Sequence, residues 1–283
     1  MKKWLLYFFA VIIILTATPF VSSKLVGRKE TEVEVNINGK TVLMNLDEYV
    51  ARVLLGEGQA CESAESKKAL AVAVRSCCMN LLSFGGRHTD FDFCDRFDCC
   101  FALGDIENCN EETLEKTISA VNETKGIFLT YKNMPALSLF TLCSGSSGAF
   151  FELAEELTPI KEDHVCEIHK TEKTIHYENI LKDRENAVLV YDENNDCSFA
   201  VWDGKYIKGT ELKEKLSLPS TEFTLEFRDD GIFATAYGLG NGFGMSLCHA
   251  ETMAKNGKTF EEILEFYYPN FVACAPNQKQ VFD

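Results

Sequence analysis

The order of hydrophobic patterns along the chain constrains its fold more than any other feature. Short alternating stretches typical of strands are mixed with amphipathic stretches typical of helices, without the strict strand–helix–strand repeat of a parallel sheet. The sequence therefore predicts an α+β fold, with its strands and helices around a ligand-binding groove. The chain has 283 residues, of which 46% are hydrophobic, and a chain of this size folds without needing disulfides or metals.

The predicted elements follow from local signals. Thr31–Ile37 alternates and is followed by Asn38-Gly39, which predicts a hairpin with Thr41–Met44. Helices are expected from Leu46, capped by Asn45, to about Gly56-Glu57-Gly58, and at Ser63–Phe84, 111–125, 210–216, 246–256 and 259–267. Further strands are expected at 127–131, 137–142, 188–191, 199–202, 221–227 and 232–237, with a turn at Lys132–Pro135. The segment 152–197 is the least assignable, because its first part, 152–183, is highly charged.

The N-terminal segment indicates export. Lys2 and Lys3 precede an apolar run, Trp4–Val21, of about the length that spans hydrocarbon. Residues 1–23 are predicted to be a signal anchor, or else a cleaved signal peptide. In both cases the two lysines keep the N-terminus on the cytoplasmic side of the membrane, and the domain 24–283 is extracytoplasmic. It is anchored to the cell membrane, or secreted if the segment is cleaved.

Charge and cysteine content restrict the ligands. The formal net charge of −15 argues against nucleic-acid binding, which depends on neutralising phosphates. Twelve cysteines include the adjacent pairs Cys77–Cys78 and Cys99–Cys100, and disulfide geometry disfavours bridges between neighbours. A reducing setting or a metal explains these cysteines better than a disulfide framework does.

Glu57 is the candidate acid. It lies between two glycines after an apolar helix, where desolvation would raise its pKa and keep it protonated, as a general acid requires. The alternative is an ordinary solvated glutamate in a turn.

A second candidate site lies in the loop 87–101. It contains His88, Cys94, Cys99 and Cys100, a set of one imidazole and three thiolates that suits a closed, structural zinc site. The alternatives are thiols in a loop, a disulfide, or a cysteine nucleophile with a histidine partner.

Two loops of small residues, Cys143–Gly148 and Gly238–Ser246, could line the groove. Their short polar side chains suit sugar hydroxyls, and each alone could equally be a tight turn. The predicted substrate contacts are Ser144, Ser146, Asn241, Ser246 and the mid-helix Arg75. The alternative for Arg75 is a snorkelling arginine.

Several motifs in order resemble the stage II sporulation protein D (SpoIID) family of peptidoglycan lytic transglycosylases. They are Leu46–Val50 with Gly56-Glu57, Lys68–Arg75, the His88-x5-Cys94-x4-Cys99-Cys100 motif, Phe140–Gly148, Gly209–Phe223, Gly240–Ser246 and Ile263–Pro269. Cys99, Cys143 and Asn241 stand where the family usually has His, and Leu247 stands where it has Gln.

The resemblance implies a function. Glu57 would be the catalytic acid that cleaves the bond between N-acetylmuramic acid (MurNAc) and N-acetylglucosamine (GlcNAc), forming 1,6-anhydroMurNAc. His88, Cys94, Cys99 and Cys100 would hold a structural Zn²⁺. The family acts in sporulation, at engulfment, on glycan stripped by a partner amidase, so a sporulation amidase and a membrane scaffold are expected partners.

Two other functions stay open. The substitutions at Cys143, Asn241 and Leu247 favour a non-catalytic peptidoglycan-binding or amidase-enhancing protein with the same fold. A cysteine peptidase or amidase would need a pair such as Cys248–His249. Neighbouring side chains on a helix point about 100° apart, which disfavours that pair.

Overall fold

The computed structural model describes residues 31–96, 99–145, 149–153, 156–160, 169–176, 188–191, 197–202, 205–229, 231–240 and 244–274. The predicted anchor or signal peptide, residues 1–23, lies outside these ranges. Within them, no helix combines the length and the hydropathy needed to cross a bilayer.

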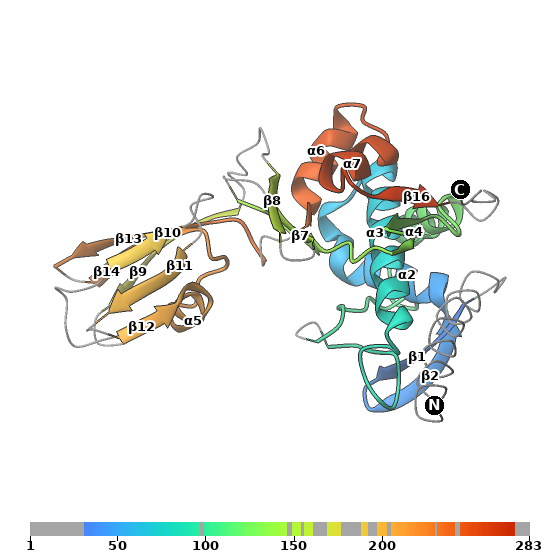
Figure 1. Ribbon diagram of the computed structural model, residues 1–283, viewed down its shortest axis with the longest axis horizontal. Helices are drawn as coiled ribbons and strands as arrows, with labels where there is room; N and C mark the ends of the chain where they lie inside the picture. The colour runs from blue at the N-terminus through green and yellow to red at the C-terminus, as the bar shows by residue number, and fades with distance from the viewer. Residues whose placement is uncertain are drawn as a thin grey trace, which may run out of the picture.

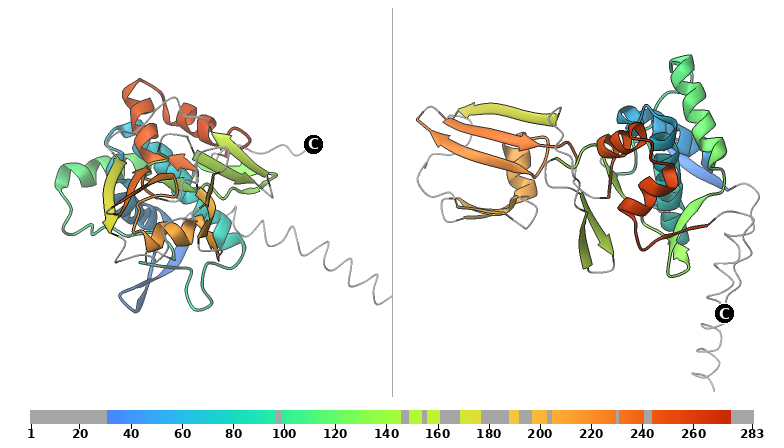
Figure 2. Two further views of the ribbon diagram at one scale, coloured as in Figure 1. Left: turned by 90° about the vertical axis from the view of Figure 1, so that its left-hand side faces the viewer. Right: turned by 90° about the horizontal axis from the view of Figure 1, so that it is seen from above.

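Helices and strands are mixed, as the α+β prediction expected, and they form two lobes (Figure 1). The helical lobe is made by both ends of the chain, and the sheet lobe by a stretch between them. The view from above also separates the two lobes, with the hairpin of β7 and β8 between them (Figure 2). This hairpin pairs β7 (Ala149–Leu153) with β8 (Glu156–Ile160).

The helical lobe begins with the predicted hairpin. Strand β1 (Glu32–Ile37) pairs antiparallel with β2 (Lys40–Asn45), and both turn residues, Asn38 and Gly39, have positive φ, as this tight turn requires. The Asn45 side chain then accepts a hydrogen bond from the Asp47 amide at 2.8 Å and caps helix α2 (Leu46–Glu57). A short parallel strand, β3 (Phe93–Cys94), adds to the other edge of β1, so the cysteine-rich loop packs on the hairpin.

Helix α3 (Ala64–Ser83) forms the centre of the helical lobe. Every residue from Ala69 to Val74 is fully buried, as expected of a helix enclosed on all sides. Its neighbours are α2, α4, α6, α7 and β4. The remaining elements of this lobe are the 3-10 helix η1 (Gly58–Ala60), α4 (Glu111–Glu123), β4 (Phe128–Tyr131), β5 (Met134–Pro135), β6 (Phe140–Thr141), β15 (Met245–Ser246), α6 (Leu247–Lys255), α7 (Phe260–Tyr267) and β16 (Val272–Cys274).

The sheet lobe has its own hydrophobic core, which includes Leu212, Phe223 and Ile232. Two three-stranded sheets, β10-β11-β12 and β13-β14-β9, surround this core, and helix α5 packs on β11. The elements are β9 (Lys170–His176), β10 (Val188–Tyr191), β11 (Cys197–Trp202), β12 (Lys205–Lys208), α5 (Gly209–Lys215), β13 (Phe223–Arg228) and β14 (Gly231–Tyr237).

Most predicted elements are confirmed, with two corrections. The expected strand 137–142 is reduced to β6, and the expected turn residues Met134-Pro135 form β5, which pairs with β4. Only Lys132 and Asn133 make the turn, both with positive φ. Strands β8 and β9, and the end of β7, lie in the charged segment that local patterns left unassigned.

Candidate functional site

Glu57 is the last residue of α2 and is half-buried. Its Oε1 accepts a hydrogen bond of 2.7 Å from the backbone amide of Ala102. Within the described part of the chain, no hydrogen bond to Oε2 is formed. The carboxyl group is therefore oriented by one oxygen, and the other can meet a ligand.

The segment Phe101–Gly104, here called the strap, runs against the end of α2. A Cβ at Gly56 would overlap the carbonyl of Ala102, and a Cβ at Gly104 would overlap Leu55. The Gly104 amide donates to the Arg52 carbonyl at 2.7 Å. Both glycines are thus needed because the two backbones touch, and this contact places the Ala102 amide on Glu57.

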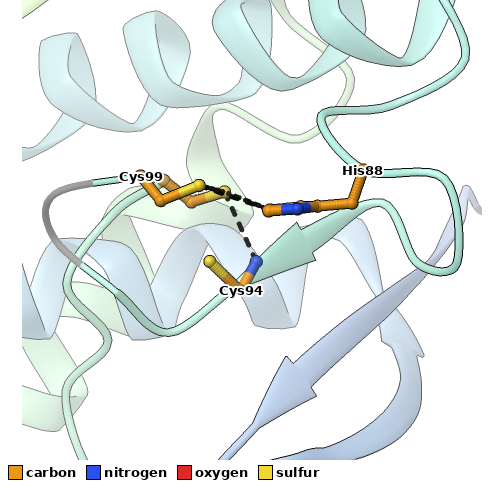
Figure 3. Close-up of side chains that lie close together, drawn as sticks. His88, Cys94 and Cys99 are labelled. Carbon is orange, nitrogen blue, oxygen red and sulfur yellow. Dashed lines mark hydrogen bonds between the residues drawn. The ribbon is translucent and has the colours of Figure 1, made fainter.

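The strap follows directly from the cysteine cluster, whose side chains point toward one another (Figure 3). The ligand atoms of His88, Cys94, Cys99 and Cys100 all lie within 4.8 Å of one another. His88 Nε2 is 3.4 Å from Cys99 Sγ and 3.5 Å from Cys100 Sγ, and the two sulfurs are 4.0 Å apart.

These distances fit a tetrahedral zinc ion. Zn–S bonds of about 2.3 Å and Zn–N bonds of about 2.05 Å place tetrahedral ligands about 3.8 Å (S to S) and about 3.6 Å (S to N) apart. Burial raises the pKa of the Cys100 thiol to about 12, and a bound cation is what would favour its thiolate. The Cys94 amide donates to Cys100 Sγ at 3.4 Å, which further supports a thiolate.

The loop that carries the cluster is held to the hairpin by two carboxylates. Asp92 accepts a hydrogen bond from the Glu34 amide, and Asp95 accepts one from the Asn38 amide, both at 2.9 Å. These contacts, together with β3, fix His88 and Cys94 from one side.

An aromatic contact connects the strap with the small-residue loops. The rings of Phe101 and Phe140 stack with centroids 5.4 Å apart. Phe140 begins β6, which pairs in parallel with β15. Strand β6 leads into the loop 143–148, and β15 ends the loop 238–246, the two loops expected to line the groove. Strands β6 and β15 are therefore connected to the cluster and Glu57 through the strap.

Arg75 does not point to a ligand. It is 3% exposed and its guanidinium donates to Asp47 on α2 and to the carbonyls of Val121, Thr124 and Ile127 around the end of α4. A buried cation at a helix C-terminus compensates the carbonyl dipoles. This corrects both the expected substrate contact and the snorkelling alternative: Arg75 ties α2, α3 and α4 together.

The predicted serine contacts are also internal. Ser246 is 1% and Ser144 7% exposed, and the Ser144 amide donates to Ser246 Oγ at 3.3 Å. This hydrogen bond joins the two loops to each other. The contact of Ser144 and Ser246 with substrate stays a prediction. Ser146 and Asn241 lie outside the described residues.

One constellation escaped the sequence analysis. Cys143, His169 and Cys248 also bring their ligand atoms within 4.8 Å of one another. The pair Cys248–His249 is indeed not formed, since His249 Nδ1 lies 2.8 Å from Tyr267 Oη, whereas Cys248 Sγ lies 3.6 Å from His169 Nδ1. One feature of the sequence indicates this constellation. Cys143 stands where the SpoIID family usually has a histidine, and both residue types can ligate a metal.

Known proteins resemble this chain over most of its length. The family profile described as "SpoIID: Stage II sporulation protein" matches residues 37–131. Stage II sporulation protein D of Bacillus subtilis is 30% identical over 251 residues, 79% of this chain and 72% of that protein. Stage II sporulation protein D of Bacillus amyloliquefaciens is 25% identical over 272 residues, 85% of this chain and 78% of that protein.

Proposed function

Because the chain belongs to the stage II sporulation protein D family, we propose that it processes peptidoglycan during sporulation as a lytic transglycosylase with Glu57 as the single acid and base. The observation that carries the proposal is the hydrogen bond from the Ala102 amide to Glu57 Oε1. It holds a carboxyl group at a fixed angle and leaves Oε2 to carry the transferable proton.

The reaction needs one carboxyl group acting twice. Protonated Glu57 donates its proton to the oxygen that links MurNAc C1 to GlcNAc, and that C1–O bond breaks as the sugar gains oxocarbenium character. The resulting carboxylate takes the proton of the MurNAc O6 hydroxyl, and O6 bonds to C1. The products are a GlcNAc end and a 1,6-anhydroMurNAc end. Hydrolases differ because they use a second carboxylate to activate water or to attack carbon.

The cysteine cluster positions the strap, which in turn orients Glu57. We assign His88, Cys94, Cys99 and Cys100 to a structural Zn²⁺, whose four protein ligands leave no position for a catalytic water. The residues of the loop do the positioning: Cys100 leads into the strap, and the strap presents the Ala102 amide to Glu57. A carboxyl displaced by about 1 Å can lose about a hundredfold in rate.

We also propose where the enzyme acts. The substrate is the glycan strand of peptidoglycan, and residues 1–23 anchor the catalytic part outside the cytoplasm, next to a partner amidase and a membrane scaffold. Nucleic acid is not expected as a ligand, because the net charge is −15.

The variant Glu57→Gln tests the proposal. Glutamine keeps an oxygen that accepts from Ala102 but cannot transfer the proton, so we expect release of anhydromuramoyl ends from peptide-free glycan strands, followed by mass spectrometry, to fall by about a hundredfold to ten-thousandfold. Glu48, on the same helix, forms an ion pair with Arg52 at 3.0 Å, so Glu48→Gln is the matched control and should keep the wild-type rate.

The outcomes separate the competing functions. Equal product release by Glu57→Gln and the wild type would refute the assignment of Glu57. Glycan binding by the wild type without any anhydromuramoyl product would favour the non-catalytic alternative, which the replacements at Cys143 and Leu247 suggest.

A further inference from the structure

Cys143, His169 and Cys248 come from three separate segments. Cys143 follows β6, His169 directly precedes β9, and Cys248 is the second residue of α6. All three ligand atoms lie within 4.8 Å of one another. Cys143 is the first residue of the loop 143–148, and none of the three residues belongs to the first cysteine cluster or to the strap. Both sulfurs lie within 4.8 Å of the ligand nitrogen of His169.

One distance in this triad fits two ligands of the same zinc ion. Cys248 Sγ lies 3.6 Å from His169 Nδ1, and ligands on a tetrahedral zinc ion are about 3.6 Å apart for S to N, given bonds of about 2.3 and 2.05 Å. A disulfide would need only the two sulfurs and would give the imidazole no role.

Backbone hydrogen bonds hold each ligand in place without an ion. Cys143 and Leu239 exchange two bonds, of 3.0 and 2.9 Å. The Cys248 amide donates to the Leu142 carbonyl at 3.1 Å, and the Gly238 amide donates to the His169 carbonyl at 3.0 Å. A site whose ligands are fixed beforehand binds its ion without the cost of ordering them.

The triad lies where the lobes join. Residues 143 and 248 belong to the helical lobe, whereas His169 and Gly238 flank the strands of the sheet lobe. We propose that Cys143, His169 and Cys248 bind a second zinc ion, which clamps the sheet lobe to the start of α6. Two sulfurs and one imidazole select a soft ion such as zinc. This site is independent of the reaction proposed for Glu57.

Metal counting on the full chain tests the proposal. Protein purified under reducing conditions is stripped with a chelator and titrated with Zn²⁺, counted by mass spectrometry of the metal, and with Co²⁺, read by its thiolate charge-transfer absorption. We expect two ions per chain for the wild type, one for Cys94→Ser and one for Cys248→Ser. Cys109→Ser, a partly exposed cysteine outside both clusters, should keep two.

A second variant distinguishes the loss of a zinc ligand from misfolding. Cys143→His replaces one zinc ligand by another and should keep two ions, with less sulfur character in the cobalt spectrum. The inference is overturned if Cys248→Ser binds as many ions as the wild type, or if the wild type binds one ion that Cys94→Ser removes. Peptide mapping that finds a Cys143–Cys248 disulfide in protein kept from reductant, with one ion bound, would also overturn it.

Discussion

Gly56, which has no side chain, allows a backbone contact that orients the carboxyl group of its neighbour Glu57. The carbonyl of Ala102 occupies the space where a Cβ would stand at Gly56, and the amide of the same residue holds Glu57. The orientation of the carboxyl group is therefore set by a backbone contact that only glycine permits at this position.

Gly56→Ala should displace the strap. We expect a loss of about 1–3 kcal/mol in the free energy of unfolding, as for other overpacked sites, and about a hundredfold lower release of anhydromuramoyl ends. Thermal melts and product analysis measure the two effects. Gly39→Ala is the control, because no atom lies within 4 Å of its Cβ, so only backbone strain is added. Wild-type turnover by Gly56→Ala would show that the strap contact is irrelevant to catalysis.

The central helix α3 depends on a residue of another helix at its N-terminus. Glu251 of α6 accepts hydrogen bonds from the amides of Glu62 and Ser63, at 3.0 and 2.9 Å, and from the hydroxyls of Ser63 and Ser66. A carboxylate satisfies amides that the helix itself cannot, and it complements the positive end of the helix dipole. Two elements far apart in the sequence are thus joined by one charge.

Glu251→Gln should weaken this junction in a pH-dependent way. Burial raises the pKa of Glu251, but the hydrogen bonds lower it by more, so that its pKa lies below the ordinary value. The carboxylate therefore contributes its full stability above about pH 4.3, the ordinary Glu pKa, and loses it as the pH falls through the lowered pKa.

At pH 7 we expect Glu251→Gln to lower the free energy of unfolding by about 1.5–3 kcal/mol, the typical contribution of a hydrogen bond to a charged group. Denaturant unfolding from pH 7 to pH 3 should show the difference from wild type shrinking toward the acid end. Glu265→Gln, an exposed residue of α7, is the control and should match the wild type throughout. A difference that is constant with pH would contradict the role of charge.

The described residues form two separate hydrophobic cores, one in each lobe. Ile232 in β14 and Ile263 in α7 are both fully buried, one in each core. Since each core is built by its own elements, damage to one need not spread through the other.

The pair Ile232→Ala and Ile263→Ala tests this independence. Each should cost about 2–5 kcal/mol locally, because a buried isoleucine leaves a cavity. Hydrogen–deuterium exchange should rise in β9–β14 for Ile232→Ala, and in α3, α6 and α7 for Ile263→Ala. A uniform rise across both lobes in either variant would mean that the molecule unfolds as one cooperative unit.

Local patterns were sufficient for most elements of this protein. Asn45 accepts the expected capping hydrogen bond, and Asn110 and Thr259 cap their helices with the same kind of bond. The Asn38-Gly39 turn has the positive φ values that its residues favour. Such signals act over three or four residues, so they are readable in the sequence. The ligand spacing in the loop 87–101 was readable for the same reason, because all four side chains lie in one short stretch.

Packing alone decided which distant segments meet. Cys248 and His169 are 79 residues apart, and Ala102 and Glu57 are 45 residues apart. Arg75 is buried by contacts with α2 and the end of α4, which the sequence of its own helix α3 does not predict. No local rule specifies such pairs, since they form only when the cores close and bring the backbones into contact. The free energy that places these side chains comes from the burial of many other residues, so no local sequence pattern next to them predicts the contact.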